Sequence, residues 1–268
     1  MPLAVCATPI GNLDDVTLRV LRELADADVV LCEDTRRTRL LLDRHSISGR
    51  LVSYHEHNEA ARAAELLPQL VQGRRVALVS DAGLPAISDP GARLIAAALE
   101  AGVTVTVLPG PSAVETALVA SGFPCDRYEF IGYLPRGRGA LRLLWEELSQ
   151  WPHAVVAFES PRRLPATLTS LAEALPDRPV AVCRELTKVF EEVVRGGPAD
   201  VLARFPEPPN GEITLVLAPF REERAADLAV PVGAVAELVA AGVSRRQAAD
   251  LVARLTGIPR NRLYRSSL

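Results

Sequence analysis

The sequence is poor in several residue types, and each shortage narrows the class of protein. Among 268 residues there is a single lysine, Lys188, so arginine supplies nearly all of the positive charge, and the formal net charge is −3. An acidic chain of this kind gives no overall sign of nucleic-acid binding, although a local basic patch can act within an acidic whole. Aromatic residues make up only 4% of the chain, so we expect a mostly aliphatic core.

Cysteine and histidine patterns exclude the common metal and disulfide classes. The four cysteines, Cys6, Cys32, Cys125 and Cys183, form no CxxC pair, and three of them lie in strand-like runs. We expect buried, reduced thiols of a cytoplasmic protein. The histidines lack HExxH spacing, so no metal site is expected. No apolar run is long enough to span a membrane, and the N-terminus does not read as a secretory signal.

The stretch from residue 76 to residue 91 is the most informative. An apolar run at 76–79 predicts a buried strand, and a loop of Gly, Pro, Ser and Asp follows and leads into a helix. The same layout recurs at residues 3–12 and 103–112. Ligands of open α/β sheets bind at the carboxyl ends of strands, so three such loops predict one binding cleft. Turn geometry alone is the alternative explanation for the Gly and Pro residues.

Strands and helices alternate along most of the chain, which predicts an α/β fold. The alternation in residues 1–120 predicts an N-terminal α/β domain with a mostly parallel sheet covered on both faces. A second α/β series, in residues 125–220, predicts a C-terminal domain with a cleft between the two. Residues 220–227 read as a charged linker, and residues 231–268 as a helical tail, either a helix-turn-helix or a packing element.

Longer motifs at these loops carry a resemblance to a known family. The motifs are Thr-Pro-Ile-Gly-Asn at 8–12, Glu-Asp-Thr-Arg at 33–36, Ser-Asp-Ala-Gly at 80–83, Pro-Gly-Pro-Ser at 109–112 and Arg-Glu-Leu-Thr-Lys at 184–188. The chain resembles the ribosomal RNA methyltransferase branch of the tetrapyrrole methylase superfamily over roughly residues 3–217. The resemblance implies S-adenosylmethionine in the cleft and a homodimer. It also implies 2′-O-methylation of a cytidine in 16S rRNA, near the decoding centre.

The resemblance also implies which residues hold the methyl donor. They come from both predicted domains: Pro9, Ile10, Asp81, Leu84, Ser112, Ala113, Phe158, Arg184 and Gly211. A methyl group on a sulfonium is already electrophilic, so the protein mainly orients the reactants and excludes water. A ribose 2′-hydroxyl is a poor nucleophile that benefits from a base or a cation. Glu185 and Lys188 follow a predicted strand end and are the candidates, with a structural ion pair as the alternative.

Arginines near predicted strand ends suggest a basic rim that contacts RNA phosphates. They are Arg36, Arg37, Arg39, Arg136, Arg138, Arg162 and Arg163. Ordinary solvated surface is the alternative for each. Two other functions stay open: a tetrapyrrole methyltransferase of corrin or sirohaem synthesis, and a non-enzymatic RNA-binding or assembly protein that uses the tail. The motifs at 8–12 and 33–36 favour the rRNA branch.

Overall fold

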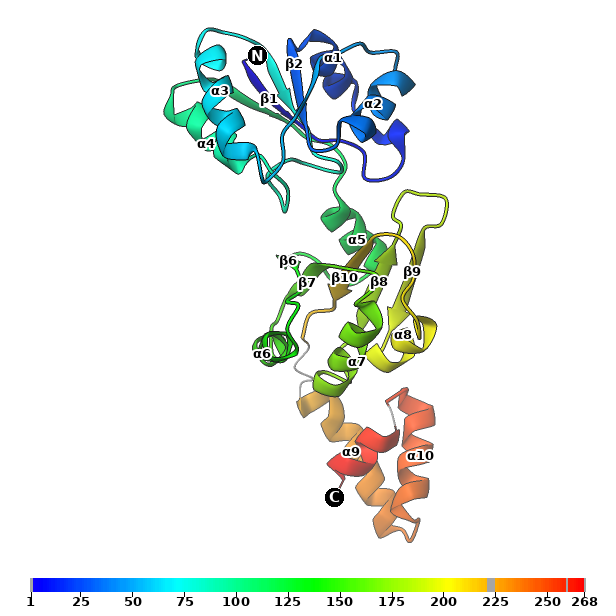
Figure 1. Cartoon of the computed structure of the whole chain (residues 1–268). Helices are drawn as coiled ribbons and strands as arrows, with labels where there is room; N and C mark the ends of the chain where they lie inside the picture. Colours follow the sequence, from blue (N-terminus) through cyan, green and yellow to red (C-terminus); the bar gives the residue numbers. More distant parts are fainter. Residues whose placement is uncertain (1, 221–224, 259, 268) are drawn as a thin grey trace. The chain divides into compact units, whose positions relative to one another are not determined.

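The computed structural model describes residues 2–220, 225–258 and 260–267. The chain divides after Phe220 into two compact units. The first unit holds two five-stranded sheets, and the second is helical (Figure 1). Each unit is described by itself below.

The first sheet is entirely parallel, with the strand order β3-β2-β4-β1-β5. Its strands are β1 (Leu3–Cys6), β2 (Val29–Cys32), β3 (Leu51–Ser53), β4 (Val76–Leu78) and β5 (Val105–Leu108). Strands β1, β2 and β4 are fully buried, as expected for short β-branched runs in a sheet covered on both faces. The predicted parallel sheet is therefore confirmed.

Four helices cover the first sheet, two on each face, as Figure 1 shows. They are α1 (Leu18–Asp26), α2 (Thr35–Arg44), α3 (Glu59–Val71) and α4 (Ala92–Glu100), and a 3₁₀ turn, Leu13–Asp15, precedes α1. Side-chain caps start two of them, because Thr17 accepts a hydrogen bond from the backbone of Val20 and Asp34 from that of Arg36. Helices α1 and α2 pack on one face, and α3 and α4 on the other.

The second sheet is mixed, with the order β6-β7-β10-β8-β9. Its strands are β6 (Tyr128–Tyr133), β7 (Ala154–Glu159), β8 (Val180–Arg184), β9 (Glu192–Gly196) and β10 (Ile213–Leu217). The β6–β7 pair is parallel, and the other three pairs are antiparallel. Strand β9 begins at Glu192, three residues later than the apolar alternation from Val189 suggests.

The two faces of the second sheet are covered by helices from different parts of the chain. Helices α6 (Arg138–Leu148), α7 (Leu164–Ala174) and α8 (Pro198–Arg204) share one hydrophobic cluster with it. Helix α5 (Ala113–Ser121) lies almost entirely within the predicted N-terminal domain, residues 1–120. Its Val114, Ala117 and Leu118 nevertheless pack on the opposite face of the second sheet. The sequence analysis does not anticipate that packing, nor the short helix α8.

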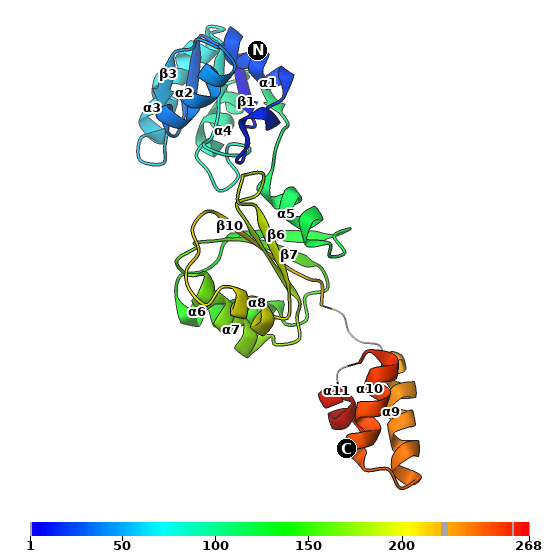
Figure 2. The same cartoon turned by 90° about the vertical axis from the view of Figure 1, so that its right-hand side faces the viewer.

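The second compact unit contains helices α9 (Ala225–Ala240), α10 (Arg245–Thr256) and α11 (Arg260–Ser266) (Figure 2). They enclose a small core of Val235, Ala248, Ala249, Val252 and Leu263. Ser244 caps α10 by accepting the backbone N–H of Gln247, and left-handed Gly257 ends it, two residue types typical of these positions. Helix α9 starts before residue 231 and contains Pro231. The predicted linker at 220–227 falls partly outside the described residues, as does Pro259.

Two expectations about surfaces can be compared with the structure. Cys6, Cys32 and Cys183 are buried, but Cys125 is exposed, so the expectation of four buried thiols was wrong for the cysteine in the loop before β6. Within the described part of the chain, no helix is both long enough and apolar enough to cross a membrane.

Candidate active site

The candidate site lies where two neighbouring strands of the first sheet are followed by helices on opposite faces of that sheet. Strands β1 and β4 are adjacent, and they lead to α1 on one face and to α4 on the other. Their loops are joined by an antiparallel bridge, with 2.8 Å from the N–H of Thr8 to the carbonyl of Gly83 and 3.0 Å in reverse. The Thr8 hydroxyl also donates to the carbonyl of Ser80 at 3.0 Å. This is the crevice at which open α/β sheets bind ligands.

A cavity of about 470 Å³ lies at this crevice, between the strand ends of both sheets. The size suits a small organic ligand. Seven of the nine predicted donor-binding residues line it: Ile10, Asp81, Leu84, Ser112, Ala113, Phe158 and Gly211. Residues from the loops after β1, β4 and β5 are thus brought together with residues of the second sheet, as the three Gly/Pro loops suggested.

The other two predicted donor-binding residues lie elsewhere. Pro9 lines a neighbouring cavity of about 230 Å³. Arg184 donates to Glu192 at 3.1 Å and to the carbonyl of Asn210 at 3.2 Å, and is not among the residues that line the larger cavity. Its contacts hold the ends of β8, β9 and β10 together.

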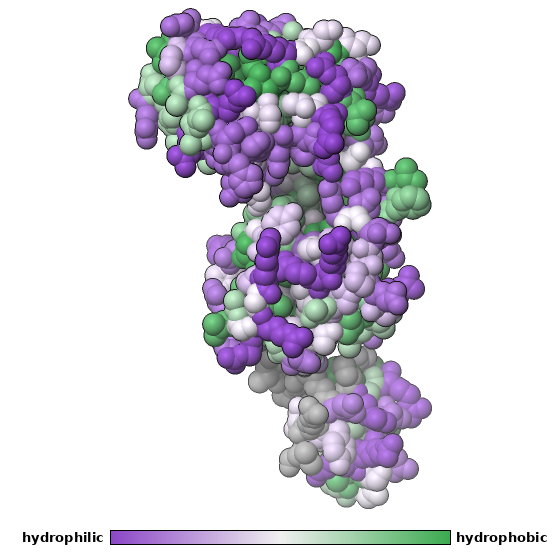
Figure 3. Space-filling model, viewed as in Figure 1, coloured by the Kyte–Doolittle hydropathy of each residue, from purple (hydrophilic) through white to green (hydrophobic). Residues whose placement is uncertain are grey.

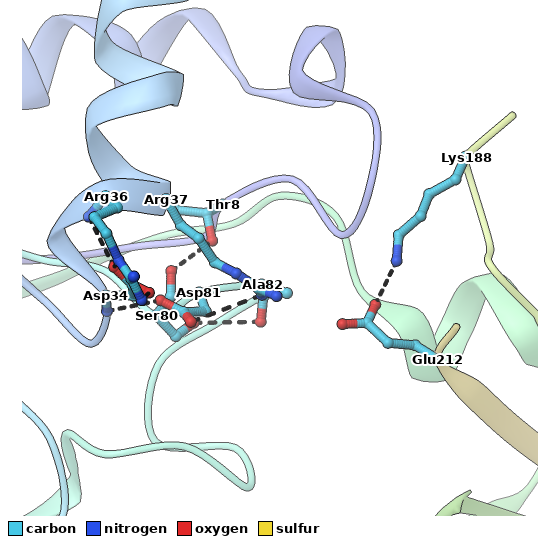
Figure 4. Close-up of polar contacts among 9 residues, drawn as sticks. All are labelled: Thr8, Asp34, Arg36, Arg37, Ser80, Asp81, Ala82, Lys188 and Glu212. Atoms are coloured by element: carbon cyan, nitrogen blue, oxygen red, sulfur yellow. Dashed lines mark hydrogen bonds and ion pairs between the residues drawn. The ribbon is translucent and has the colours of Figure 1, made fainter. Parts of the chain in front are cut away.

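Carboxylates gather on the first-sheet side of the cavity. Asp81 accepts the backbone N–H of Asp34 at 2.9 Å, and a guanidinium nitrogen of Arg37 lies 3.7 Å from its other oxygen (Figure 4). Burial and the nearby Glu33 raise the pKa of Asp89 to about 6. Burial, followed by Asp81, also raises the pKa of Glu33. Together these carboxylates give this side of the cavity a negative potential suited to a cation.

Glu33 and Asp89 also line the cavity, although neither was predicted from the sequence as a site residue. Glu33 lies inside the Glu-Asp-Thr-Arg motif, and Asp89 lies in the loop of Gly, Pro, Ser and Asp that follows the apolar run at 76–79. Glu33 directly follows β2, which was the available signal for it, whereas Asp89 lies near the end of the loop between β4 and α4.

The second-sheet side holds a buried carboxylate, Glu159, at the end of β7. Its side chain is 0% exposed and lies 2.5 Å from the guanidinium of Arg163. It also accepts the N–H of Ser160 and the hydroxyl of Thr167, both at 2.6 Å. Arg163 in turn donates to the carbonyls of Leu134 and Pro135 at 3.0 and 3.1 Å. These contacts engage Arg163 inside the protein, so we do not retain it among the arginines proposed to bind RNA.

A strained loop after β8 carries the two candidate catalytic residues. Glu185 and Thr187 have positive φ values, 53° and 65°, which non-glycine residues rarely adopt. Lys188 Nζ donates to Glu185 at 2.7 Å and to Glu212 at 2.8 Å, and Figure 4 shows the latter contact. Lys188 and Glu212 line the cavity of about 230 Å³, and Glu212 also lines the larger one.

The charge states of this trio follow from its contacts. Burial lowers the pKa of Lys188, but the hydrogen bonds to Glu185 and Glu212 outweigh that effect, and the net pKa lies above the ordinary value. Burial raises the pKa of Glu185, but the bonds from Lys188 and the Glu212 backbone outweigh it, so the net pKa is lowered. Lys188 is therefore a permanent cation at neutral pH, not a general base.

Two glycines let the two sides of the site approach each other. A Cβ at Gly11 would lie 2.5 Å from the Lys188 side chain and 2.8 Å from the carbonyl of Leu186. The neighbouring Asn12 N–H donates to the Thr187 hydroxyl at 3.0 Å. Gly211 has φ +103°, and a Cβ there would lie 2.4 Å from Glu185. Both positions require the absence of a side chain.

The predicted RNA-binding arginines do not form one rim. Arg37 lines the 470 Å³ cavity, whereas Arg36 pairs with Asp34 at 2.7 Å and Arg39 approaches the carbonyl of Gly49. Arg162 is exposed. Arg136 and Arg138 line, with Arg163, a separate cavity of about 1020 Å³ between α6 and α7. No group of three or more His, Cys, Asp and Glu side chains that could hold a metal ion occurs among the described residues.

Comparison with solved structures identifies the class to which this fold belongs. Uroporphyrin-III-C-methyltransferase from Thermus thermophilus matches with 24% identity and a TM-score of 0.55, covering 81% of this chain and 93% of that one. The methyltransferase CobJ matches with 22% identity and a TM-score of 0.61, at the same coverages. The sequence profile of the Tetrapyrrole (Corrin/Porphyrin) Methylases matches residues 2–201. The two sheets and their cleft are thus the fold of the tetrapyrrole methylases.

Curated relatives identify the branch within that class. The ribosomal RNA small subunit methyltransferase I of Mycobacterium tuberculosis is 46% identical, covering 98% of this chain and 93% of the relative. That of Thermotoga maritima is 45% identical, covering 81% of this chain and 97% of the relative. The RsmI C-terminal HTH domain profile matches residues 226–268. The chain belongs to the ribosomal RNA small subunit methyltransferase I family.

Proposed function

We propose that this protein is an S-adenosylmethionine-dependent methyltransferase that methylates the 2′-hydroxyl of a cytidine in 16S rRNA, near the decoding centre. One observation carries the proposal most directly. Seven donor-binding positions implied by the family come from segments far apart in sequence, and they line a single cavity at the switch point of the first sheet. The family to which the chain belongs supplies the acceptor.

The cavity fits the proposed donor in shape and in charge. Its wall includes Ala82, Gly83 and Ala113, which carry a methyl group or no side chain and so let a ligand lie against the backbone. Asp81, Asp89 and Glu33 supply negative charge for the cationic sulfonium and the amino group. When bound, the donor supplies an electrophilic methyl group, and the chain's own residues orient it and exclude water.

Lys188 provides the charge that the acceptor needs. Because it stays protonated between Glu185 and Glu212, it would stabilise the negative charge on the ribose oxygen once the 2′-hydroxyl has given its proton to solvent. Methyl transfer to that oxygen would then neutralise the charge. Replacing Lys188 with alanine then lowers kcat while donor affinity is retained, and arginine restores part of the rate. A structural ion pair instead predicts loss of folding stability with kcat unchanged.

A calorimetric titration with S-adenosylmethionine is the primary test. The parent protein should bind the donor without added metal, and Asp81→Ala should bind it more weakly. Methylation of small ribosomal subunits should then appear as a 2′-O-methylcytidine in the digested rRNA. Absence of donor binding would leave only a non-enzymatic RNA-binding role. Methylation of a porphyrinoid instead of the subunit would establish the tetrapyrrole alternative.

We also propose that the C-terminal unit docks the enzyme on its RNA in the cytoplasm. Helix α10 exposes Arg246 and Arg254, and a guanidinium nitrogen of Arg254 lies 3.7 Å from Asp250. The unit encloses its own small core. Truncation after Phe220 should therefore preserve donor affinity and reduce methylation of the subunit. A simultaneous fall in donor affinity and melting temperature would indicate a packing role.

We propose a homodimer as the working form. The loop between β8 and β9 carries Val189 and Phe190, which are 93% and 72% exposed, and Figure 3 shows a hydrophobic knob at this loop. Exposed apolar side chains on a protruding loop favour association with another surface. Light scattering should give a dimer mass for the parent protein, and Phe190→Glu should shift the mass toward the monomer.

A further inference from the structure

Tyr133 occupies an unusual position at the mouth of the cavity. The register between β6 and β7 shifts between Phe130 and Tyr133, and Gly132 in that interval has φ +67°. A Cβ at Gly132 would lie 3.8 Å from the Ser88 hydroxyl, on the loop after β4. A bulge re-aims the side chain that follows it. Here it brings the end of β6 toward the first-sheet side of the cleft.

The Tyr133 ring packs edge to face against one neighbouring ring and is otherwise largely exposed. Its centroid lies 5.5 Å from that of Phe158 at an interplanar angle of 61°, and Phe158 contacts Phe130 in the same manner at 5.0 Å. Tyr133 nevertheless stays 64% exposed while lining the cavity. Such edge-to-face pairs fix the orientation of a ring. The result is a rigid aromatic surface with its remaining area facing solvent.

Carboxylates from both sides of the cavity act on the Tyr133 phenol. Partial burial, followed by Glu212 and then Asp89, raises the pKa of this phenol. Glu212 directly precedes β10 of the second sheet, and Asp89 lies on the loop between β4 and α4, so Tyr133 lines the cavity near carboxylates of both sides. Tyr133 and Phe158 are the aromatic residues among those that line the cavity, and Phe158 is the less exposed of the two.

We propose that Tyr133 is the platform on which the base of the acceptor nucleotide stacks while its ribose enters the cavity. This inference rests on the proposed function. A 2′-hydroxyl can reach a donor held inside a cleft only if its nucleotide leaves the neighbouring stack. Proteins that read unstacked RNA bases commonly offer an aromatic face to replace the lost stacking.

The phenolic hydroxyl is dispensable under this proposal, and the ring is essential. Tyr133→Phe and Tyr133→Trp keep a ring, whereas Tyr133→Leu keeps apolar bulk without one. Tyr128→Leu is the matched control, because Tyr128 begins the same strand, is 42% exposed and is not among the residues that line the cavity. Steady-state methylation of small ribosomal subunits and calorimetric donor affinity are measured for all five proteins.

The expected result is a loss confined to the acceptor in Tyr133→Leu. Stacking of one base on an aromatic ring is worth roughly 1–3 kcal/mol, so kcat/KM for the subunit should fall about 10- to 100-fold. Tyr133→Phe and Tyr133→Trp should remain within about threefold of the parent, as should Tyr128→Leu. Donor affinity should be equal throughout, because the donor does not use this ring.

Three outcomes overturn the inference. Tyr133→Leu with parental kcat/KM would show that nothing stacks there. Equal damage in Tyr133→Phe and Tyr133→Leu would assign the effect to the hydroxyl. A parallel loss of donor affinity would reduce Tyr133 to a support for Phe158. A parent protein that binds the donor but does not methylate the subunit refutes the proposed function itself, and is distinguished because it involves no substitution.

Discussion

The two sides of the cleft differ in the groups that line them. The first-sheet side consists mainly of backbone loops with small residues, such as Ala82, Gly83 and Ala113. The second-sheet side presents large side chains, such as Tyr133 and Phe158. Strand direction explains the difference. The parallel strands of the first sheet all end at one edge and turn into helices there, so their loops gather at the cleft.

Antiparallel strands bring a different set of atoms to the same cleft. On the second side β7 and β8 end where β10 begins, so side chains near strand ends and strand starts meet. The ion pairs that lie there join these ends: Glu159 with Arg163, and Lys188 with Glu185 and Glu212. We infer that the first side holds the donor with backbone and carboxylates, and that the second side handles the acceptor with rings and charges.

The largest effect on stability should come from breaking the buried pair of the second side. Arg163→Ala leaves the fully buried carboxylate of Glu159 without its cation, which typically costs 3–5 kcal/mol. We expect about 3 kcal/mol, since Ser160 and Thr167 still donate to it. Urea denaturation measures the change.

Arg142→Ala is the matched control, because Arg142 pairs with Glu146 on the exposed face of α6. The loss there should stay below about 1 kcal/mol. Equal losses in the two variants would show that Arg163 acts as an ordinary surface arginine.

The contact between the two sides can be disturbed from the first side alone. Gly11→Ala places a Cβ 2.8 Å from the Leu186 carbonyl, and overpacking of this kind costs about 1–3 kcal/mol. Donor affinity should fall as well, because the adjacent Ile10 lines the cavity. Thermal melting and donor titration are the measurements.

Gly139→Ala controls for the loss of a glycine. Nothing lies within 4 Å of a Cβ at Gly139, which is in helix α6, so alanine there should stabilise by about 0.5–1 kcal/mol. An unchanged melting temperature in Gly11→Ala would mean that the two sides do not touch in solution.

The acidic character of the first side predicts a pH dependence of stability. The pKa of Asp89 is about 6 in the folded protein, above its ordinary value of 3.8, so the folded state binds this proton more tightly. Its contribution to stability is present below about pH 4 and is lost as the pH rises through 6. Asp89→Asn should therefore be more stable than the parent at pH 7, on the order of 1 kcal/mol, and equal to it below pH 4.

The difference in stability between Asp89→Asn and the parent is measured from denaturant midpoints at pH 4, 5 and 7. Asp126→Asn, on an exposed loop, is the control and should show no trend with pH. A difference between Asp89→Asn and the parent that is constant across this range would contradict the assignment.

The smallest expected effect tests whether arginines on the second-sheet side contact RNA phosphates. Within the described part of the chain Arg136 and Arg138 make no hydrogen bond or ion pair, and both line the cavity between α6 and α7. Replacing both with alanine should lower the dependence of log K on log salt by roughly 1.5, if each contacts one phosphate. Arg19→Ala, on exposed α1, is the control. A parental salt slope in the double variant would remove these two arginines from the RNA-binding set.

Much of the fold could be predicted because its signals are local. The run at β4 and the Gly/Pro loop after it mark a strand end without reference to any other part of the chain. Errors occur where packing overrides local pattern. Val189 continues an apolar alternation, yet it lies in an exposed loop, and Pro231 lies inside α9 although it reads as a helix start.

The candidate site divides in the same way. The sequence by itself determined the Gly/Pro loops that line the cavity, because a backbone that turns sharply from strand to helix needs Gly, Pro and small residues at fixed places. Only the tertiary structure decided that Arg163 neutralises Glu159, that Lys188 bridges two carboxylates, and that Tyr133 lines the cavity. Those roles depend on which strand ends meet. The contact between Asn12 and Thr187, 175 residues apart, shows why local sequence could not reveal it.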